Sequence, residues 1–142
     1  MSMTTITRHF RIDAGHRVWG HESKCAHLHG HSYSLELTVC AEQLDSLGRV
    51  IDFGVVKDVV GSWVDTCWDH NVLLHPDDPL IRVLAHAENG RSPWIMSYGN
   101  PTAENIAREF FEISTDLLKQ HQIIVTKARV YETPNCWADY VG

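Results

Sequence analysis

The first clear pattern along the chain is an alternation of apolar and polar residues over positions 4–16. Apolar side chains fall on one parity and polar side chains on the other, which is typical of a strand with one buried face. The alternation returns over 31–42 and again over 122–132, and we expect 136–141 to pair behind the short turn that follows. The pattern therefore predicts a four-stranded antiparallel sheet.

Two other segments have apolar residues at helical spacing. The first covers 53–67, and the second begins after Thr102, a plausible N-cap with Glu104 in the first turn behind it. Between them, prolines and glycines interrupt 75–99, where a helical turn at 80–87 and a short strand at 94–98 fit the sequence. The order of elements predicts an α+β fold with two helices on one face of the sheet.

The size and charge of the chain narrow the class of protein. A chain of 142 residues with 44% hydrophobic residues fits one domain, and we assign 1–142 to it. The net charge of -6 gives no basic surface for nucleic acid, and no apolar run is long enough to span a membrane. Because the N-terminus also lacks a signal-peptide pattern, we expect a cytoplasmic protein.

Histidines carry most of the candidate chemistry. His29 and His31 flank Gly30, so in an extended segment both rings project from the same face, and His16 has the inward parity of the first strand. Three neutral imidazoles that leave a fourth position open are typical of a catalytic Zn²⁺ site. The alternative interpretation is a polar strand end without metal. The four cysteines lack C-x-x-C spacing, which argues against a disulfide framework.

Several of these residues, taken together and in this order, resemble the superfamily of 6-pyruvoyl and 6-carboxytetrahydropterin synthases. The resemblance implies the T-fold, in which sheets and helices of several subunits form a barrel, commonly a homohexamer built as a dimer of trimers. Relative to this pattern, the segment around 76–98 is longer than expected and is interpreted as an insertion. The matching residues are His16, Cys25, His29-Gly30-His31, Asp69-His70, Pro101-Thr102-Ala103-Glu104-Asn105 and Tyr131-Glu132-Thr133.

The spacing from Cys25 to His29 looks like the carboxy-forming branch used in queuosine precursor synthesis. That branch implies a zinc-dependent lyase that converts 7,8-dihydroneopterin triphosphate to 6-carboxytetrahydropterin with loss of acetaldehyde and triphosphate. Three alternatives stay open: a paralogue that makes a pyruvoyl or hydroxymethyl pterin, a zinc-stabilised binding module without turnover, and a metal-free pterin binder. The ending from Pro134 to Tyr140 departs from the cysteine-containing tail of some carboxy-forming members.

The resemblance also implies roles for individual residues. Cys25 takes a proton from the substrate side chain, although a fourth zinc ligand is the competing interpretation. His70 is the second proton-transfer group and is oriented by Asp69; the competing interpretation is a surface histidine at a helix end. This pair works with a cysteine of another subunit in related enzymes. Glu132 binds the guanidine-like edge of the pterin, unless it is a solvated strand end.

The remaining candidates are less specific. Thr102 and Glu104 are expected to close the pterin pocket, but helix capping explains both equally well. Arg17, Lys24 and His27 are candidate partners of the triphosphate because they lie in the loop beside the metal ligands. Ordinary solvated side chains explain each of these three as well.

Overall fold

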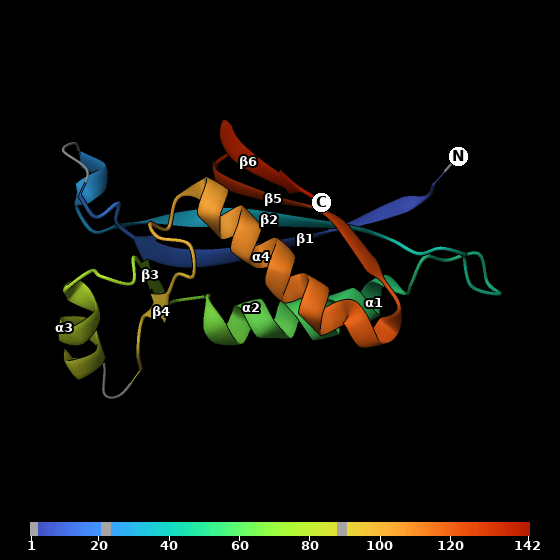
Figure 1. Ribbon diagram of the computed structural model, residues 1–142, viewed down its shortest axis with the longest axis horizontal. Coiled ribbons are helices and arrows are strands. Elements are labelled where there is room, and N and C mark those ends of the chain that lie inside the picture. The colour runs from blue at the N-terminus through green and yellow to red at the C-terminus, as the bar shows by residue number, and fades with distance from the viewer. Residues whose placement is uncertain (1–2, 21–23, 88–90) are drawn as a thin grey trace.

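The structure, a computed structural model, describes residues 3–20, 24–87 and 91–142. Its centre is a six-stranded sheet with the strand order β4-β3-β1-β2-β5-β6 (Figure 1). Four strands are antiparallel neighbours and match the four predicted ones: β1 (Thr5–His16), β2 (His29–Cys40), β5 (Ile124–Thr133) and β6 (Cys136–Val141). The second begins two residues earlier than predicted, so that it includes the candidate metal ligands.

The predicted strand count of four is wrong, because two short strands extend the sheet. β3 (Val72–Leu74) pairs in parallel with the end of β1, and β4 (Trp94–Ile95) pairs in parallel with β3. Segments of three and two residues are too short to show an alternation, which is why the pattern missed the first and placed the second only approximately. The sheet is therefore mixed, although its central part is antiparallel.

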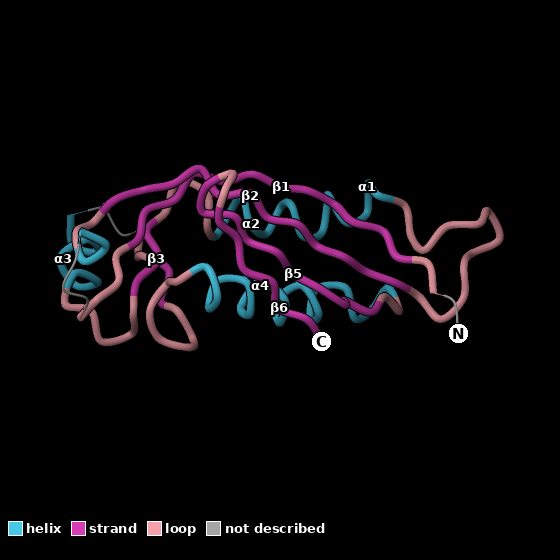
Figure 2. Tube along the Cα trace, turned by 90° about the horizontal axis from the view of Figure 1, so that it is seen from above, coloured by secondary structure: helices cyan, strands magenta, loops and turns pink. Residues whose placement is uncertain are grey.

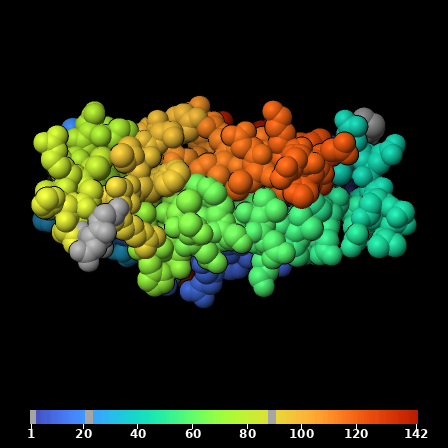
Figure 3. All heavy atoms as spheres, turned by 90° about the horizontal axis from the view of Figure 1, so that it is seen from below, coloured from blue at the N-terminus to red at the C-terminus, as the bar shows by residue number. Residues whose placement is uncertain are grey.

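Two helical segments cover one face of the sheet (Figure 1). The first runs without a break through α1 (Phe53–Val56), a π-helical stretch (Lys57–Gly61) and α2 (Ser62–Cys67), as its apolar spacing predicted. The second is α4 (Ala103–Leu118), followed by a 3-10 turn (Lys119–His121). Figure 3 shows the two lying side by side over this face, and their apolar sides close the core against the inward parity of the strands.

A third helix, α3 (Leu80–Ala87), was not among the two predicted, although a helical turn fitted its sequence. It lies at one end of the molecule beside β3 and β4, whereas the N-terminus lies at the other end (Figures 1 and 2). None of its residues is fully buried, so it belongs to the predicted insertion and not to the core. Residues 88–90 of that insertion fall outside the described residues. In the described part of the chain, no helix is long and apolar enough to cross a membrane.

The register of β1 and β2 fixes the position of the histidines. Gly15 pairs with Gly30 and His16 with His29, without a bulge, so the parity argument holds to the end of both strands. A β-carbon on Gly30 would lie 3.2 Å from the backbone oxygen of Ala14, which is closer than most such contacts. The close approach of the two strand backbones here therefore favours glycine. The histidines therefore meet at the end of the sheet where α4 begins.

Candidate metal centre and active site

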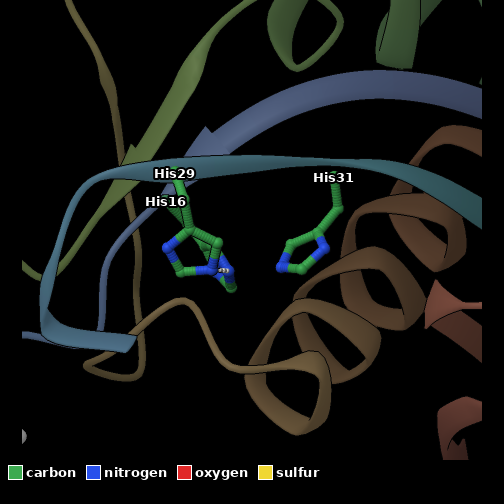
Figure 4. A group of neighbouring side chains, drawn as sticks. All are labelled: His16, His29 and His31. Atoms are coloured by element: carbon green, nitrogen blue, oxygen red, sulfur yellow. Dashed lines mark hydrogen bonds between the residues drawn. The ribbon is translucent and has the colours of Figure 1, made fainter. Parts of the chain in front are cut away.

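His16, His29 and His31 form a compact group of potential metal ligands. One ring nitrogen of each lies within 4.8 Å of the others, and the His16 and His29 Nε2 atoms are 3.2 Å apart. Figure 4 shows the three rings on the same side of β1 and β2, above the start of α4. The prediction that these residues converge is confirmed.

Backbone carbonyls orient two of the three rings. Nδ1 of His16 lies 2.6 Å from the carbonyl oxygen of Pro101, and Nδ1 of His29 lies 2.7 Å from that of His27. Because a carbonyl only accepts, each Nδ1 carries a proton and donates it, so Nε2 is the nitrogen of each ring that can bind a metal ion. Such outer hydrogen bonds are the usual way in which a protein orients metal-binding imidazoles.

The surroundings favour neutral rings. Burial lowers the pKa of His16 and of His31 below the ordinary histidine value. The ring of Tyr33 packs edge-on against both, with centroid separations of 5.7 and 5.4 Å. Among the described residues its buried hydroxyl has no hydrogen-bond partner, and burial followed by the charge of Glu132 raises its pKa. A neutral imidazole is the form that binds a metal ion.

The donor set fits a zinc site with an open position. Three imidazole nitrogens are typical ligands of catalytic Zn²⁺, which keeps its fourth position for water or substrate. Cys25 does not belong to the ligand group found in the described part of the chain. This geometry favours an open site over the closed four-ligand site that the sequence left as an alternative.

Glu132 and the start of α4 border a pocket next to the three histidines. Oε1 of Glu132 lies 3.9 Å from Nε2 of His16, and its side chain is 31% exposed. With Thr102 and Glu104, it lines a pocket of about 520 Å³ that also contacts the first residues of β6. Thr102 is also the N-cap, because its Oγ1 accepts from the Asn105 amide at 3.2 Å. The structure thus brings the three predicted pterin-pocket residues together.

Cys25 lies in a short 3-10 turn (Lys24–Ala26) of the loop that joins β1 to β2. Its carbonyl oxygen accepts a hydrogen bond from the amide of Val18 at 2.9 Å. The neighbouring Trp19 is tied to Asn100 in both directions, since its amide donates to Oδ1 at 2.7 Å and its carbonyl accepts from Nδ2 at 3.0 Å. The loop is therefore attached to the segment that leads into α4.

Arg17 forms an ion pair with Asp78 of the same chain. Its guanidinium donates from Nε and Nη2 to the two carboxylate oxygens of Asp78, at 2.7 and 2.5 Å. The Asp78 side chain is fully buried, so most of the positive charge is neutralised inside the protein. Arg17 is thus a poorer candidate for binding triphosphate than the sequence indicated. Lys24 and His27 stay candidates.

Asp69 and His70 form an ion pair at the turn that follows α2. Oδ2 of Asp69 lies 2.9 Å from Nδ1 of His70, and Oδ1 accepts from the Asp13 amide at 2.8 Å. Burial alone would raise the pKa of Asp69, but the hydrogen bonds from Asp13 and His70 lower it below its ordinary value. An ionised carboxylate on Nδ1 fixes the ring and leaves Nε2 of His70 facing outward, as a proton-transfer group requires.

The pair is held by the backbone of β1 at Asp13. His70 is 74% exposed and lines a shallow pocket together with Asp13, Ser32 and the candidate ligand His31. His70 does not belong to the ligand group found among the described residues. This arrangement fits the expectation that the pair acts at the site of another subunit.

Sequence reasoning missed the residues that hold this site in place. Pro101 lies 85 positions from His16 and contacts it through a carbonyl oxygen, which no side-chain pattern reveals. Asp78 and Arg91 lie in the segment 76–98, which the sequence predicted to be an insertion and to which it assigned no role. An acidic residue two positions before the 80–87 helical turn was a usable signal, because Oδ1 of Asp78 accepts from the Leu80 amide at 2.8 Å.

Comparison with known proteins extends over almost the entire chain. The family model described as 6-pyruvoyl tetrahydropterin synthase matches residues 5–142. A protein of Rickettsia bellii named 6-carboxy-5,6,7,8-tetrahydropterin synthase is 42% identical over 138 residues, covering 96% of this chain and 99% of its own. The protein of the same name from Rickettsia typhi is 44% identical over an equal span and equal shares.

Solved structures share the fold. An uncharacterized protein of Wolinella succinogenes superposes with a TM-score of 0.84 at 22% identity, over 100% of this chain and 99% of its own. The 6-pyruvoyl tetrahydropterin synthase of Caenorhabditis elegans gives a TM-score of 0.72 at 22% identity, over 100% and 97%. The expected T-fold is therefore confirmed.

Proposed function

This chain belongs to the 6-pyruvoyl tetrahydropterin synthase family and is a lyase, and on this premise we propose that it converts 7,8-dihydroneopterin triphosphate into 6-carboxy-5,6,7,8-tetrahydropterin. Water is consumed in this reaction, and acetaldehyde and triphosphate are released. The observation that carries the proposal is the position of Glu132, 3.9 Å from the His16 ligand atom. A pterin bound to this carboxylate has its side chain beside the metal ligands.

His16, His29 and His31 are proposed to hold Zn²⁺, and the support is that one ring nitrogen of each lies within 4.8 Å of the others, while Nδ1 of His16 and of His29 donates to a backbone carbonyl. When bound, Zn²⁺ supplies a Lewis acid that polarises the oxygens of the substrate side chain. His16 is buried, so water is excluded from its side of the three-histidine site. The backbone contacts of His16 and His29 hold both rings in one orientation before any ligand arrives.

Glu132 is proposed to select the pterin. The 2-amino group and the neighbouring ring N–H of a pterin form a donor pair that matches the two oxygens of a carboxylate. Thr102 and Glu104 border the same pocket at the N-terminus of α4. The pocket, about 520 Å³, is large enough for a bicyclic ring, since ligand pockets of small molecules usually measure roughly 300–1,000 Å³.

Proton transfer is assigned to Cys25 and His70. Cys25 takes a proton from the substrate side chain, and His70, oriented by Asp69, exchanges the second proton. Because His70 is mostly exposed and does not belong to the ligand group of the described residues, the pair is proposed to serve a neighbouring subunit. A homohexamer built as a dimer of trimers, a cytoplasmic location and a role in queuosine precursor synthesis belong to the same proposal.

The test is mass analysis of products after zinc-loaded protein has been incubated anaerobically with 7,8-dihydroneopterin triphosphate. We expect the 6-carboxy product together with acetaldehyde. A pyruvoyl or hydroxymethyl product would overturn the proposed reaction while keeping the pterin pocket. Unchanged substrate in the presence of bound zinc would overturn catalysis itself and favour a binding module.

A further inference from the structure

Arg91, in the insertion, holds the backbone of the Asp69–His70 pair. Its Nη1 donates to the carbonyl oxygen of His70 at 3.2 Å, and its Nη2 donates to that of Asp69 at 3.1 Å. One planar guanidinium thus bridges two consecutive peptide groups, which a single-point cation cannot do in the same way. The next residue of each segment makes a second contact, in which Nδ2 of Asn71 donates to the Ser92 carbonyl oxygen at 3.4 Å.

The segment that Arg91 holds has an unusual backbone conformation. His70 has a φ of 57°, in the left-handed region that few non-glycine residues adopt. Its amide donates to the carbonyl oxygen of Asp13 at 2.7 Å, which fixes the peptide group on its N-terminal side. Arg91 binds the carbonyl of the same residue, so the peptide groups on both sides of His70 are held. A strained residue at a functional site persists only where its surroundings fix it in this way.

We propose that Arg91 is a positioning residue for the Asp69–His70 pair, and that this is the role of the insertion in the reaction. The inference rests on the proposed function, because it needs His70 as a proton-transfer group. Arg91 touches only backbone oxygens of the pair, and it acts by keeping the His70 ring on the Asp69 carboxylate and pointed outward. The His70 side chain is 74% exposed and that of Asp69 is 26% exposed. Packing against neighbouring side chains therefore contributes little to the orientation of the His70 ring.

A positioning role and a purely structural role give different results. Loss of a loop contact without a role in catalysis lowers stability and leaves turnover unchanged. Loss of the positioning contact lowers kcat and leaves KM unchanged, because Glu132 and the pterin pocket lie elsewhere in the chain. A displacement of about 1 Å in a reacting group can cost roughly 100-fold in rate.

The experiment compares Arg91→Ala and Arg91→Lys with Arg82→Ala, which removes an exposed arginine of α3 in the same insertion. We expect kcat of Arg91→Ala to fall by roughly 10- to 100-fold at unchanged KM and zinc content. Arg91→Lys restores only part of the rate, because lysine lacks the two-pronged donor. Arg82→Ala retains full activity. An unchanged kcat for Arg91→Ala, or an equal loss in Arg82→Ala, would overturn the proposal.

Two further measurements separate this proposal from the proposed function. In a His70→Ala background, Arg91→Ala should cause no additional loss of rate, and an undiminished loss would show that Arg91 acts elsewhere. Hydrogen exchange of the peptide covering 68–72, which needs no turnover, should become faster in Arg91→Ala and not in Arg82→Ala; unchanged exchange would overturn the backbone role. If the wild-type protein makes no 6-carboxy product, the proposed reaction fails, whereas the exchange comparison still tests Arg91.

Discussion

Arg17 and Asp78 form a partly buried ion pair in which both oxygens of the buried carboxylate accept from one guanidinium, at 2.7 and 2.5 Å. Arg17 directly follows the metal ligand His16, and Asp78 caps α3 in the insertion through the Leu80 amide. The pair therefore joins the loop that carries Cys25 to a segment 61 residues further along the chain. Loss of this ion pair is therefore expected to displace the loop between β1 and β2.

Removal of Asp78 is expected to destabilise the protein strongly. Asp78→Ala leaves the Arg17 guanidinium without its partner and removes the cap of α3, for a predicted loss of about 3 kcal/mol in the free energy of unfolding. Urea unfolding measures this change. The matched control is Asp77→Ala, since Asp77 is exposed and the predicted change is within about 0.5 kcal/mol. Equal effects of the two variants would contradict the assigned role of the pair.

The same pair predicts a dependence of stability on acid pH. Burial alone would raise the pKa of Asp78, but the hydrogen bonds from Arg17 and the Leu80 amide lower it below its ordinary value. A carboxyl with a depressed folded pKa stabilises the protein fully above its unfolded pKa of about 3.9, and loses this effect as pH falls through the folded value. The stability difference between wild type and Asp78→Asn should therefore shrink on acidification. A pH-independent difference would contradict the ionised state.

The central fold could be predicted from the sequence because its elements are long and periodic. The alternation in 4–16 and the spacing in 53–67 gave strand and helix with nearly the observed bounds. β3 was missed, because Val72–Leu74 is a three-residue apolar run that any buried segment can contain. The parallel pairing of β3 with β1 depends on tertiary contacts, and local pattern carries no information about them.

The metal ligands could be predicted from the sequence, whereas their supports could not. His29 and His31 share a face by local geometry, and the parity of His16 needed only strand pairing. The contact of His16 with Pro101 needs the position of α4 above the sheet. The left-handed conformation of His70 after α2 and its hydrogen bonds to Asp13 and Arg91 likewise depend on tertiary contacts, which the Asp-His sequence does not reveal.

Metal binding is expected to depend on the three histidines and not on Cys25. Replacing His16, His29 or His31 by alanine should bring zinc content, measured by elemental analysis of purified protein, close to zero, because each supplies one ligand atom. Cys25→Ala should retain zinc and fold, yet lose activity. A Cys25 variant that loses its zinc would show that the thiol is a ligand and contradict the open site.

Removal of zinc by a chelator is expected to stop turnover without unfolding the protein. The core is built mainly from apolar residues of the sheet and of the helical segments, and of the three histidine ligands only His16 is buried. Far-ultraviolet circular dichroism should therefore change little when a chelator removes zinc, while turnover stops and returns on addition of Zn²⁺. Unfolding on chelation would indicate a structural zinc site.

Substrate recognition is expected to depend on the charge of Glu132. Glu132→Gln keeps the shape of the side chain but replaces one carboxylate acceptor by a donor, which faces the donor edge of the pterin. A lost hydrogen bond to a charged group costs about 1.5–3 kcal/mol, which corresponds to a rise in KM of roughly 10- to 150-fold. Steady-state kinetics measure this rise, and zinc content should stay unchanged because Glu132 is not one of the ligands. Glu36→Gln is the matched control, because Glu36 has the outward parity of β2, and it should leave KM unaltered. If Glu132→Gln bound substrate as well as the control, pterin recognition would have to come from other groups in the pocket.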